Sequence, residues 1–327
     1  MINMIKLKGG SLSSTYLCEL NGKKFVRKLV HLDKDREYGF VRWYSQLKKM
    51  QHYNSVIPGV FPEIIQAGYL DSTNSAYFDL EFMDNYTDIK TLFSQHKYEF
   101  DTIKKITHAF CDSLDKIHNN KLSKIAHISN LYFREEIEQK LFDAAKHASF
   151  NEFFKYETYF YNGERIEGIN KYFDKLRFFF EQLTLDSEEM IHGNPTLENA
   201  LYSFNDNKVV FIDPYEESII DSKLLDYSQV LQCSNSGYGY INDRNPSVYD
   251  NFVKNNLKLP KSFSIFNNIF IDRNITKNTE KTINILEASQ FIRMLPFKCA
   301  TGDIEKAKFF YVHACYLIQK QFLNESV

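Results

Sequence analysis

The first eighty residues alternate apolar and polar positions over short runs, a pattern typical of half-buried β-strands. Asn21 and Gly22 separate two of these runs, and an Asn-Gly pair between apolar runs predicts a tight hairpin. A longer run with helical spacing, over 35–50, interrupts the strands. The predicted strands cover residues 4–7, 15–20, 24–30, 62–67 and 77–82.

Beyond residue 85 the apolar positions recur at the 3.6-residue period of buried helix faces. Asp101 and Asp303 stand at the start of two of these stripes and are predicted to cap the helices. The patterns together predict an α+β protein, with a small antiparallel-sheet lobe over 1–84 and a larger, mainly helical lobe over 85–327. The clearest stripes comprise Ile103, Ile106, Phe110, Leu114 and Ile117, and Ile304, Ala307, Tyr311, Cys315, Ile318 and Phe322.

The composition is that of a folded globular protein. Of the 327 residues, 43% are hydrophobic and 25% are charged, which excludes a chain that is disordered throughout. A formal net charge of −2 argues against a general nucleic-acid-binding protein. Five scattered cysteines without metal-binding spacing indicate reduced thiols. Because neither a signal peptide nor an apolar run of about 20 residues is visible, we expect a cytoplasmic protein without membrane insertion.

Charge is unevenly distributed along this nearly neutral chain. Residues 1–50 carry eleven Lys and Arg against four acids, whereas residues 186–226 carry ten acids against two Lys. A basic segment suits contacts with a polyanion, and a dense acidic segment suits divalent cations. The alternative is that both segments are solvent-exposed faces without a ligand.

The candidate chemistry lies within residues 191–213, where two apolar runs flank a polar turn and predict a hairpin. With Phe204 opposite Val209, Asn199 lies beside Asp213 at the open end of the ribbon. An amide oxygen and a carboxylate brought together in this way suit Mg²⁺. The alternative is a surface hairpin in which these two residues only cap the strand ends.

The segment His192-Gly193-Asn194, with Asn199 five residues beyond Asn194 and Ile212-Asp213 farther on, resembles the His-Gly-Asp-x4-Asn and Ile-Asp motifs of the aminoglycoside phosphotransferase and choline kinase group. The resemblance implies the two-lobed fold of the protein kinases and covers most of the chain. Shorter matches to this group follow in the same order and spacing. They are the small-residue loop over 9–14 and the segments 25–28, 36–37, 80–83, 114–118 and 225–227.

The resemblance implies that Lys28 contacts the α- and β-phosphates of a nucleoside triphosphate, ATP or GTP, and that Glu37 orients Lys28. Arg27 is the alternative for the lysine role, but strand alternation places it on the opposite face. The carbonyl of Glu81 and the N–H of Met83 would bind the adenine edge. The implied phosphate loop, whose glycines allow close approach of backbone N–H groups, comprises Gly9, Gly10, Ser11 and Ser13.

Asn199 and Asp213 are the implied Mg²⁺ ligands, and His192 and Asn194 occupy the catalytic segment. The family has Asp where this chain has Asn194, and that Asp accepts or orients the proton of the acceptor hydroxyl. An amide cannot act as a carboxylate base. Three interpretations are open: an engineered substitution, a natural pseudokinase, or a slow enzyme that relies on metal and positioning. We expect His192 to brace the loop rather than to replace the base.

The resemblance therefore implies an ATP- and Mg²⁺-dependent kinase that phosphorylates a hydroxyl of a small molecule. The alternative is a nucleotide-binding pseudokinase with a regulatory or scaffolding role. Protein-kinase activity is disfavoured because His-Gly-Asn replaces His-Arg-Asp and no Ala-Pro-Glu segment follows. Segments 226–238 and 293–296 resemble carbohydrate-associated members, which ranks a sugar or sugar derivative ahead of an aminoglycoside or choline. Tyr-rich segments at 156–161 and 238–240 would either stack on such an acceptor or pack in the core.

Overall fold

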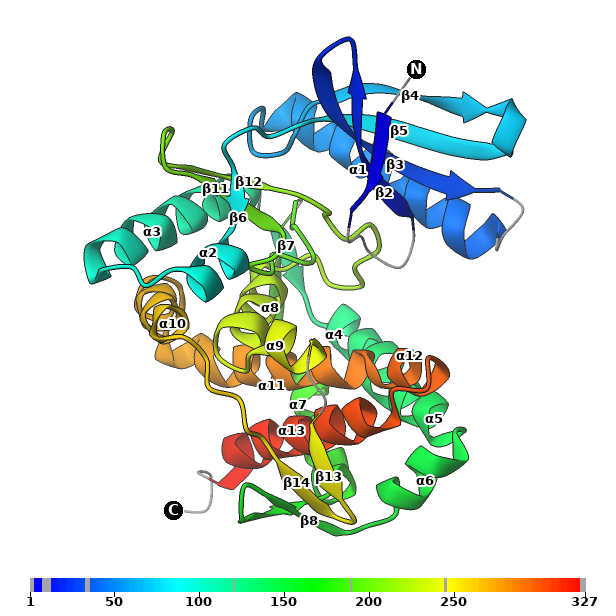
Figure 1. Cartoon of the computed structure of the whole chain (residues 1–327). Coiled ribbons are helices and arrows are strands. Elements are labelled where there is room, and N and C mark those ends of the chain that lie inside the picture. Colours follow the sequence, from blue (N-terminus) through cyan, green and yellow to red (C-terminus); the bar gives the residue numbers. More distant parts are fainter. Residues whose placement is uncertain are drawn as a thin grey trace. The chain divides into compact units, whose positions relative to one another are not determined.

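The computed structural model describes residues 3–7, 13–32, 36–119, 121–188, 190–243 and 246–323 (Figure 1). The chain forms two compact units, which we call the sheet unit and the helical unit. The sheet unit comprises Met1–Leu92, His108–Ile117 and His192–Ser218, and the helical unit comprises Phe93–Thr107, His118–Ile191 and Ile219–Val327. The N-terminal antiparallel sheet and the mainly helical C-terminal part confirm the predicted α+β class.

The N-terminal part of the sheet unit is an antiparallel sheet of five strands. These are β1 (Asn3–Lys6), β2 (Ser14–Leu20), β3 (Lys23–His31), β4 (Ile64–Leu70) and β5 (Ser75–Glu81), in the spatial order β1-β2-β3-β5-β4. A short 3-10 turn, η2 (Asp71–Thr73), connects β4 to β5. Asn21 and Gly22 both have positive φ, 52° and 76°, and join β2 to β3, so the predicted Asn-Gly hairpin is confirmed.

One long helix of the sheet unit follows β3. A π-helical turn, η1 (Arg36–Val41), continues into α1 (Arg42–Val56), so the helix predicted over 35–50 is present and extends farther. The indole ring of Trp43 contacts the ring of Phe78 on β5, with centroids 5.5 Å apart, which fixes α1 against the sheet. The buried residues of α1 are Trp43, Gln46, Leu47, Met50 and Tyr53. A single amide, Gln46, therefore lies within an otherwise apolar or aromatic helix face.

A second, smaller sheet of the sheet unit contains the predicted hairpin. Its strands are β6 (Thr87–Asp88), β11 (Ala200–Ser203) and β12 (Lys208–Phe211), in the order β12-β11-β6. The predicted register is wrong, because Ser203 pairs with Lys208 and Phe204 lies in the turn instead of opposite Val209.

Side chains of the turn set this register. The Ser203 hydroxyl donates to the Asp206 carboxylate at 2.9 Å and accepts from the Asp206 N–H at 3.2 Å. These bonds close the turn over residues 204–207 and leave Phe204 exposed. Asn199 nevertheless lies beside Asp213, because the N–H of Ile212 donates to the Asn199 carbonyl at 2.9 Å.

Two helices follow β6 along the chain, α2 (Ile89–Gln95) and α3 (Phe100–Ile117). The predicted apolar stripe of α3 is buried from Ile103 to Ile117. The predicted cap at Asp101 is wrong, because the Glu99 carbonyl already accepts from the N–H groups of Thr102 and Ile103, which places Asp101 inside the first turn.

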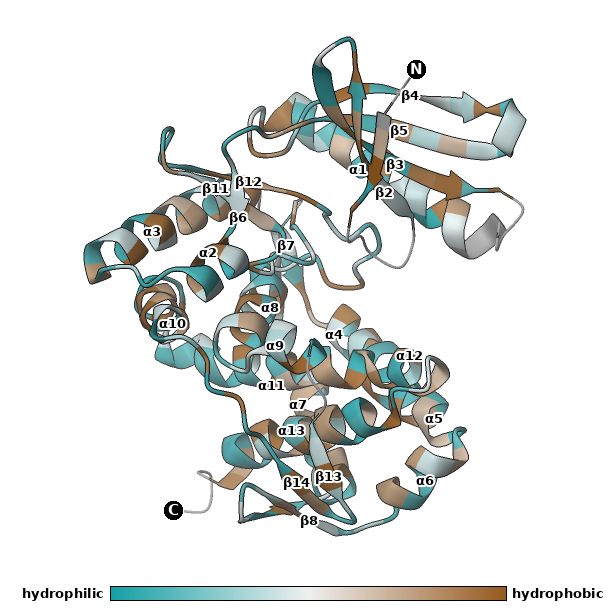
Figure 2. Ribbon diagram, in the orientation of Figure 1, coloured by the Kyte–Doolittle hydropathy of each residue, from teal (hydrophilic) through white to brown (hydrophobic). Residues whose placement is uncertain are grey.

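The helical unit is built around α11 (Lys277–Arg293) and α13 (Ile304–Leu323). Residues 309–315 of α13 are all buried, so this part of the helix is enclosed on every side rather than along one stripe. Figure 2 shows that the ribbon of α13 carries both hydrophobic and hydrophilic residues. The other helices of this unit are α4 (His127–Tyr132), η3 (Phe133–Glu138), α5 (Gln139–Ala145), α6 (Ala148–Phe154), η4 (Ile169–Tyr172), α7 (Phe173–Gln182), α8 (Lys223–Ser234), α9 (Tyr238–Asn242), α10 (Lys261–Asn274) and α12 (Leu295–Ala300).

Two small sheets complete the helical unit. β7 (Lys121–Ile125) pairs with β10 (Leu185–Glu188). β8 (Thr158–Tyr161), β9 (Glu164–Glu167), β13 (Ser247–Tyr249) and β14 (Phe252–Lys254) form the other sheet, in the order β13-β14-β8-β9. Tyr159 and Tyr161 on β8 are buried in the core, so packing, rather than stacking on a ligand, accounts for these two aromatic side chains.

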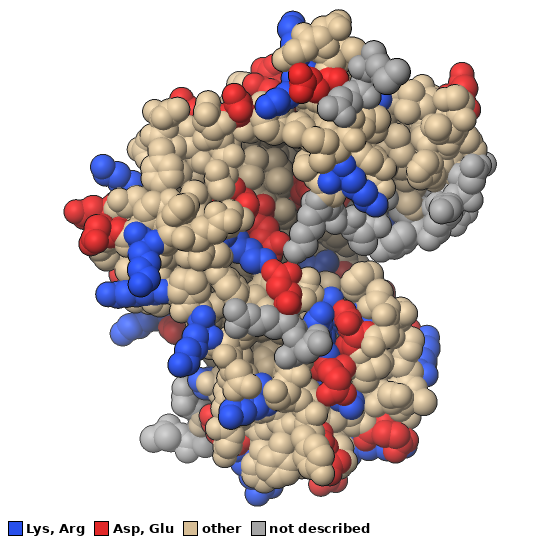
Figure 3. All heavy atoms as spheres, in the orientation of Figure 1, with Lys and Arg blue, Asp and Glu red and all other residues tan. Residues whose placement is uncertain are grey.

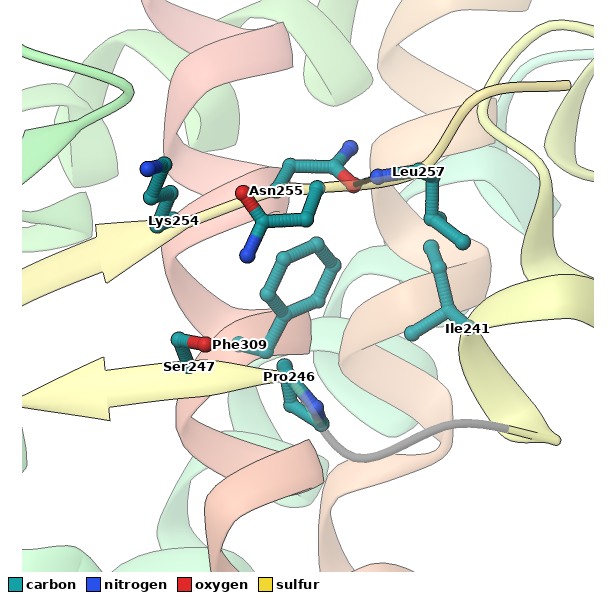
Figure 4. Close-up of a pocket in the computed structure, with 8 residues that line it drawn as sticks. Ile241, Pro246, Ser247, Lys254, Asn255, Leu257 and Phe309 are labelled. Atoms are coloured by element: carbon teal, nitrogen blue, oxygen red, sulfur yellow. Dashed lines mark hydrogen bonds between the residues drawn. The ribbon is translucent and has the colours of Figure 1, made fainter.

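A small pocket of the helical unit opens beside β13 and β14, with the ring of Phe309 between polar and apolar walls (Figure 4). Its volume of about 60 Å³ has room for a few water molecules, and no residue predicted to form the functional site lines it. The lining residues are Ile241, Pro246, Ser247, Lys254, Asn255, Asn256, Leu257 and Phe309. Within the described ranges, no helix combines the length and apolar character needed to cross a membrane.

Candidate functional site

Lys28 and Arg27 are neighbours on β3, and both are buried to 5% exposure, but they make different contacts. Arg27 donates two hydrogen bonds of 2.7 Å to the carboxylate of Asp79 on β5, which raises the pKa of Arg27 above its usual value. Lys28 instead donates to Oε1 of Gln46 on α1 at 2.9 Å. Arg27 is thus held within the sheet, whereas Lys28 lies on the α1 side, as strand alternation predicts.

The ammonium group of Lys28 also forms an ion pair with the carboxylate of Asp213. Asp213 has a positive φ of 56°, a left-handed conformation that an L-residue adopts only where its surroundings hold it. The Lys28 side chain is 7% exposed and that of Asp213 is 30% exposed, so the carboxylate remains accessible while the ammonium is enclosed. The structure therefore brings together two of the residues that the sequence predicted for the site.

The chain after Asp213 is attached to α1 by two further contacts. Arg42 forms an ion pair with the carboxylate of Glu216, and the ammonium group of Lys49 donates to the carbonyl of Tyr215 at 2.5 Å. Opposite charges in the basic and acidic segments of the sequence therefore neutralise one another in part. Figure 3 shows Lys, Arg, Asp and Glu interspersed on the face in view.

His192 lies at the start of the predicted catalytic segment and is fully buried. Its Nδ1 accepts from the N–H of Asn194 at 3.1 Å, so its Nε2 carries the proton donated to the Ile212 carbonyl at 3.0 Å. The His192 carbonyl accepts from the N–H of Tyr215 at 2.8 Å. The imidazole thus braces the loop, and both of its nitrogen atoms are used in hydrogen bonds to backbone groups.

Gly193 has a φ of 78°, and a Cβ at this position would lie 2.9 Å from the Cβ of Tyr215. A larger residue would therefore push the loop away from the chain that follows Asp213.

Asn199 and Asn194 are joined directly. Nδ2 of Asn199 donates to the backbone carbonyl of Asn194 at 3.0 Å. Because the amide nitrogen donates this hydrogen bond, Oδ1 is the Asn199 atom suited to coordinate a cation. The Asn194 carbonyl also accepts from the N–H of Thr196 at 2.8 Å, which closes the loop between the two asparagines.

The remaining predicted nucleotide residues are only partly described. Glu81 ends β5, and the carbonyl of Met83 in the following loop accepts from the N–H of Tyr86 at 3.3 Å. Ser13 is half-buried directly before β2. Gly9, Gly10 and Ser11 lie outside the described residues, and Glu37 lies in η1 with its side chain outside the description.

Two other residues, from the family-like segments 114–118 and 225–227, contact each other within the helical unit. His118, directly after α3, and Asp226 of α8 are both buried, and Nε2 of His118 lies 2.7 Å from Oδ2 of Asp226. This pair joins the end of α3 to the first turn of α8.

Known proteins resemble this chain in structure rather than in sequence. No protein-family model and no curated protein matches the sequence. A thermostable mutant of aminoglycoside phosphotransferase APH(4)-Ia superposes on the chain with a TM-score of 0.65 and 8% sequence identity, over 98% of this chain and 95% of that chain. The chain has the aminoglycoside phosphotransferase fold.

Two further solved structures have this fold. One is a thermostable APH(4)-Ia mutant in a ternary complex with AMP-PNP and hygromycin B, with a TM-score of 0.63, 9% identity and coverage of 98% of this chain and 94% of that chain. The other is a fructosamine-3-kinase-like protein from Haemophilus somnus, with a TM-score of 0.55, 11% identity and coverage of 98% and 92%. The bilobal kinase-like fold implied by the sequence resemblance is confirmed, and at these identities the likeness concerns the fold.

The donors at the open end of the hairpin fit Mg²⁺. Asp213 offers an accessible carboxylate and Asn199 an amide oxygen, and Mg²⁺ prefers such hard oxygen ligands. Among the described residues, no group of three or more His, Cys, Asp and Glu is placed to hold a metal ion. In phosphoryl-transfer sites Mg²⁺ is usually bound by one or two carboxylates together with substrate phosphates and water.

The sequence patterns did not predict the contribution of α1 to the site. Gln46 donates from Nε2 to the carbonyl of Pro214 at 3.1 Å, in addition to its contact with Lys28. A polar residue within a buried helix face was the available signal, because a buried amide needs partners for both of its ends.

Proposed function

We propose that this protein is an ATP- and Mg²⁺-dependent phosphotransferase that acts on a hydroxyl group of a small molecule. The observation that carries the proposal is the contact between Lys28 and Asp213 on a kinase-like fold, with Asn199 beside Asp213. The solved complexes of APH(4)-Ia with ADP or AMP-PNP support a nucleoside triphosphate, ATP or GTP, as co-substrate. Within this proposal, residues 1–84 form the nucleotide-binding lobe, and residues 85–327 carry the metal and acceptor sites.

Each residue has a distinct task in phosphoryl transfer, which depends mainly on positioning and charge neutralisation. Lys28 would bind the α- and β-phosphates, and the backbone of Glu81 and Met83 would bind the adenine edge. Asp213 and Oδ1 of Asn199 would hold Mg²⁺, which when bound supplies positive charge to the phosphate oxygens. Residues Gly9, Gly10, Ser11 and Ser13 would surround the phosphates, and Glu37 is the further candidate partner of Lys28.

Asn194 limits the chemistry of the acceptor. Its amide oxygen can accept a hydrogen bond from an acceptor hydroxyl and orient it, but the amide cannot take up the proton. His192 does not replace the missing base, because both of its ring nitrogens are used in the loop. We therefore propose an enzyme of low activity or an inactivated variant, in which positioning and metal supply the remaining catalysis.

For the acceptor we propose a sugar or a sugar derivative ahead of an aminoglycoside or choline. The complex of APH(4)-Ia with hygromycin B and the fructosamine-3-kinase-like protein support a hydroxylated small molecule. The second candidate function is a nucleotide-binding pseudokinase. The amide at Asn194 favours it, because the catalytic base is missing whereas Lys28, Asn199 and Asp213 are present.

Thermal melts with millimolar ATP or GTP and Mg²⁺ test the nucleotide site, since a ligand that binds only the folded state raises the melting temperature. Lys28→Met is the matched negative variant. The expected result is a stabilisation by nucleotide and Mg²⁺ that is markedly smaller in Lys28→Met. Wild-type melts that nucleotide does not shift would overturn both the kinase and the pseudokinase. ADP release in the presence of sugars, aminoglycosides and choline then separates these two functions.

A further inference from the structure

The side chain of Gln46 connects Lys28, the proposed phosphate-binding residue, to the chain directly after Asp213, the proposed metal-binding residue. Its Oε1 accepts from Nζ of Lys28 at 2.9 Å, and its Nε2 donates to the carbonyl of Pro214 at 3.1 Å. Pro214 directly follows Asp213. Gln46 is 8% exposed, so both contacts are shielded from competing water.

Only an amide satisfies both partners at this position. Lys28 requires an acceptor, and the Pro214 carbonyl requires a donor. A carboxylate of the same shape would accept from Lys28 and would place its second oxygen against the Pro214 carbonyl oxygen. The buried carbonyl would then lack its donor and face a negative charge, which is unfavourable.

Neighbouring contacts hold the two ends of this bridge in place. Arg42, Gln46 and Lys49 occupy one side of α1, at spacings of four and three residues. Arg42 pairs with Glu216 and Lys49 binds the Tyr215 carbonyl, so each residue from Pro214 to Glu216 contacts α1. A shift of α1 would therefore move Lys28 and the segment after Asp213 together.

We propose that Gln46 is a positioning residue that couples the binding of nucleotide phosphate at Lys28 to the binding of Mg²⁺ at Asp213. The inference rests on the proposed nucleotide and metal site, and Gln46 itself contacts neither ligand. Lys28 pairs with Asp213 in this structure. Bound phosphate must therefore replace Asp213 as the partner of Lys28, and Mg²⁺ must replace Lys28 as the partner of Asp213. Gln46 keeps the ammonium and the Asp213 backbone in register while this exchange takes place. Such coupling is reciprocal: Mg²⁺ raises nucleotide affinity by the factor by which nucleotide raises Mg²⁺ affinity.

The test measures the dissociation constant of ATP by calorimetry at pH 7.5, with and without Mg²⁺. The ratio of interest is the value without Mg²⁺ divided by the value with Mg²⁺. We expect the ratio to fall by about tenfold in Gln46→Glu, which retains the Lys28 contact but cannot donate to Pro214. Gln46→Met, which has a similar length and no hydrogen bonds, should show a comparable fall. Gln66→Met is the control, because Gln66 donates to Asp79, the partner of Arg27, and should leave the ratio unchanged.

A purely structural role for Gln46 would weaken ATP binding equally in both conditions and leave the ratio intact. Wild-type ratios in both Gln46 variants, with melting temperatures that show folded protein, would overturn the inference and leave the proposed function standing. If the wild-type protein binds no ATP under either condition, the proposed function fails, and the inference fails with it.

Discussion

The side-chain amide of Asn199 donates a 3.0 Å hydrogen bond to the backbone carbonyl of Asn194, so a proposed metal ligand holds the backbone of the proposed acceptor-binding residue. The N–H of Asn194 is bound as well, by Nδ1 of His192. The main chain at Asn194 is therefore fixed by contacts that do not involve its own side chain. A change of that side chain should alter chemistry with little effect on the loop.

Asn194→Asp is the first prediction. Asp and Asn are close in volume, so the melting temperature should change little, while the new carboxylate supplies a general base. A positioned base commonly contributes about 10²–10⁴-fold in rate, and Mg²⁺-dependent ADP release should rise by a factor of that order. The measurement compares both proteins with and without a pool of sugars, aminoglycosides and choline. A restored carboxylate that brings no gain with any of these acceptors would favour the pseudokinase.

Substitution of the two adjacent cations on β3 should affect different properties, mainly nucleotide affinity for Lys28 and mainly stability for Arg27. Lys28→Met should lower Mg²⁺-ATP affinity by about 10- to 100-fold, because it removes a charged hydrogen-bond donor to phosphate. Its cost to the free energy of unfolding should be about 1–3 kcal/mol, because Oε1 of Gln46 loses its donor while the remaining carboxylate of Asp213 is accessible to water.

Arg27→Met is the matched variant for Lys28→Met. It leaves the buried carboxylate of Asp79 with a 2.8 Å hydrogen bond from Gln66 but without a charged partner, and should lower the free energy of unfolding by about 3–5 kcal/mol. Urea unfolding and ATP titration of both variants test this pair. A larger stability loss for Lys28→Met than for Arg27→Met, together with an affinity loss for Arg27→Met, would reverse the assignment of the two side chains.

Asp213→Asn should remove most of the Mg²⁺ dependence of nucleotide binding while retaining an oxygen that Lys28 can contact. Asn199→Ala should reduce that dependence less, because it removes a neutral ligand rather than a charge. Glu217→Gln is the control, an exposed acid four residues after Asp213. Calorimetric ATP titrations with and without Mg²⁺ give the comparison. Asp213→Asn and Glu217→Gln with the same Mg²⁺ dependence would contradict the assignment of Asp213 as a metal ligand.

The sequence predicted the parts of this site that depend on local pattern. Period-two alternation separated Arg27 from Lys28, and the Asn-Gly turn and the apolar runs identified both hairpins. The register of the second hairpin was wrong because hydrogen bonds of Ser203 and Asp206, rather than apolar pairing, decide where the turn begins.

Contacts between distant segments were beyond the reach of these patterns. Gln46 lies 168 residues before Pro214, and Arg42 lies 174 residues before Glu216. Spacing along the chain contains no information about such pairs until the fold brings them together. Opposite charge in the two segments was visible, but each was interpreted as a surface for a ligand, whereas part of that charge is paired internally.

A buried polar chain in the helical unit gives the last prediction its basis. The hydroxyl of Tyr161 lies 2.9 Å from Nδ1 of His313, and Nε2 of His313 lies 2.8 Å from the hydroxyl of Ser236. Ser236 donates to Oε1 of Glu287 at 2.6 Å. Burial lowers the pKa of His313 to about 3 and raises the pKa of Glu287 to about 7. The two groups therefore make opposite contributions to the pH dependence of stability.

His313 binds its proton more weakly in the folded than in the unfolded protein, so its contribution to stability rises with pH between about 3 and 6.5. Glu287 binds its proton more strongly when folded, so its contribution falls as pH rises from about 4.5 to 7. Glu287→Gln removes the falling contribution alone. The free energy of unfolding of the variant minus that of wild type should therefore be more positive at pH 8 than at pH 5, by on the order of 1–3 kcal/mol. Urea unfolding at the two pH values tests this, with Glu280→Gln, an exposed acid of α11, as the control. A difference from wild type that is equal at pH 5 and pH 8 would show that Glu287 is ionised in the folded protein across this range.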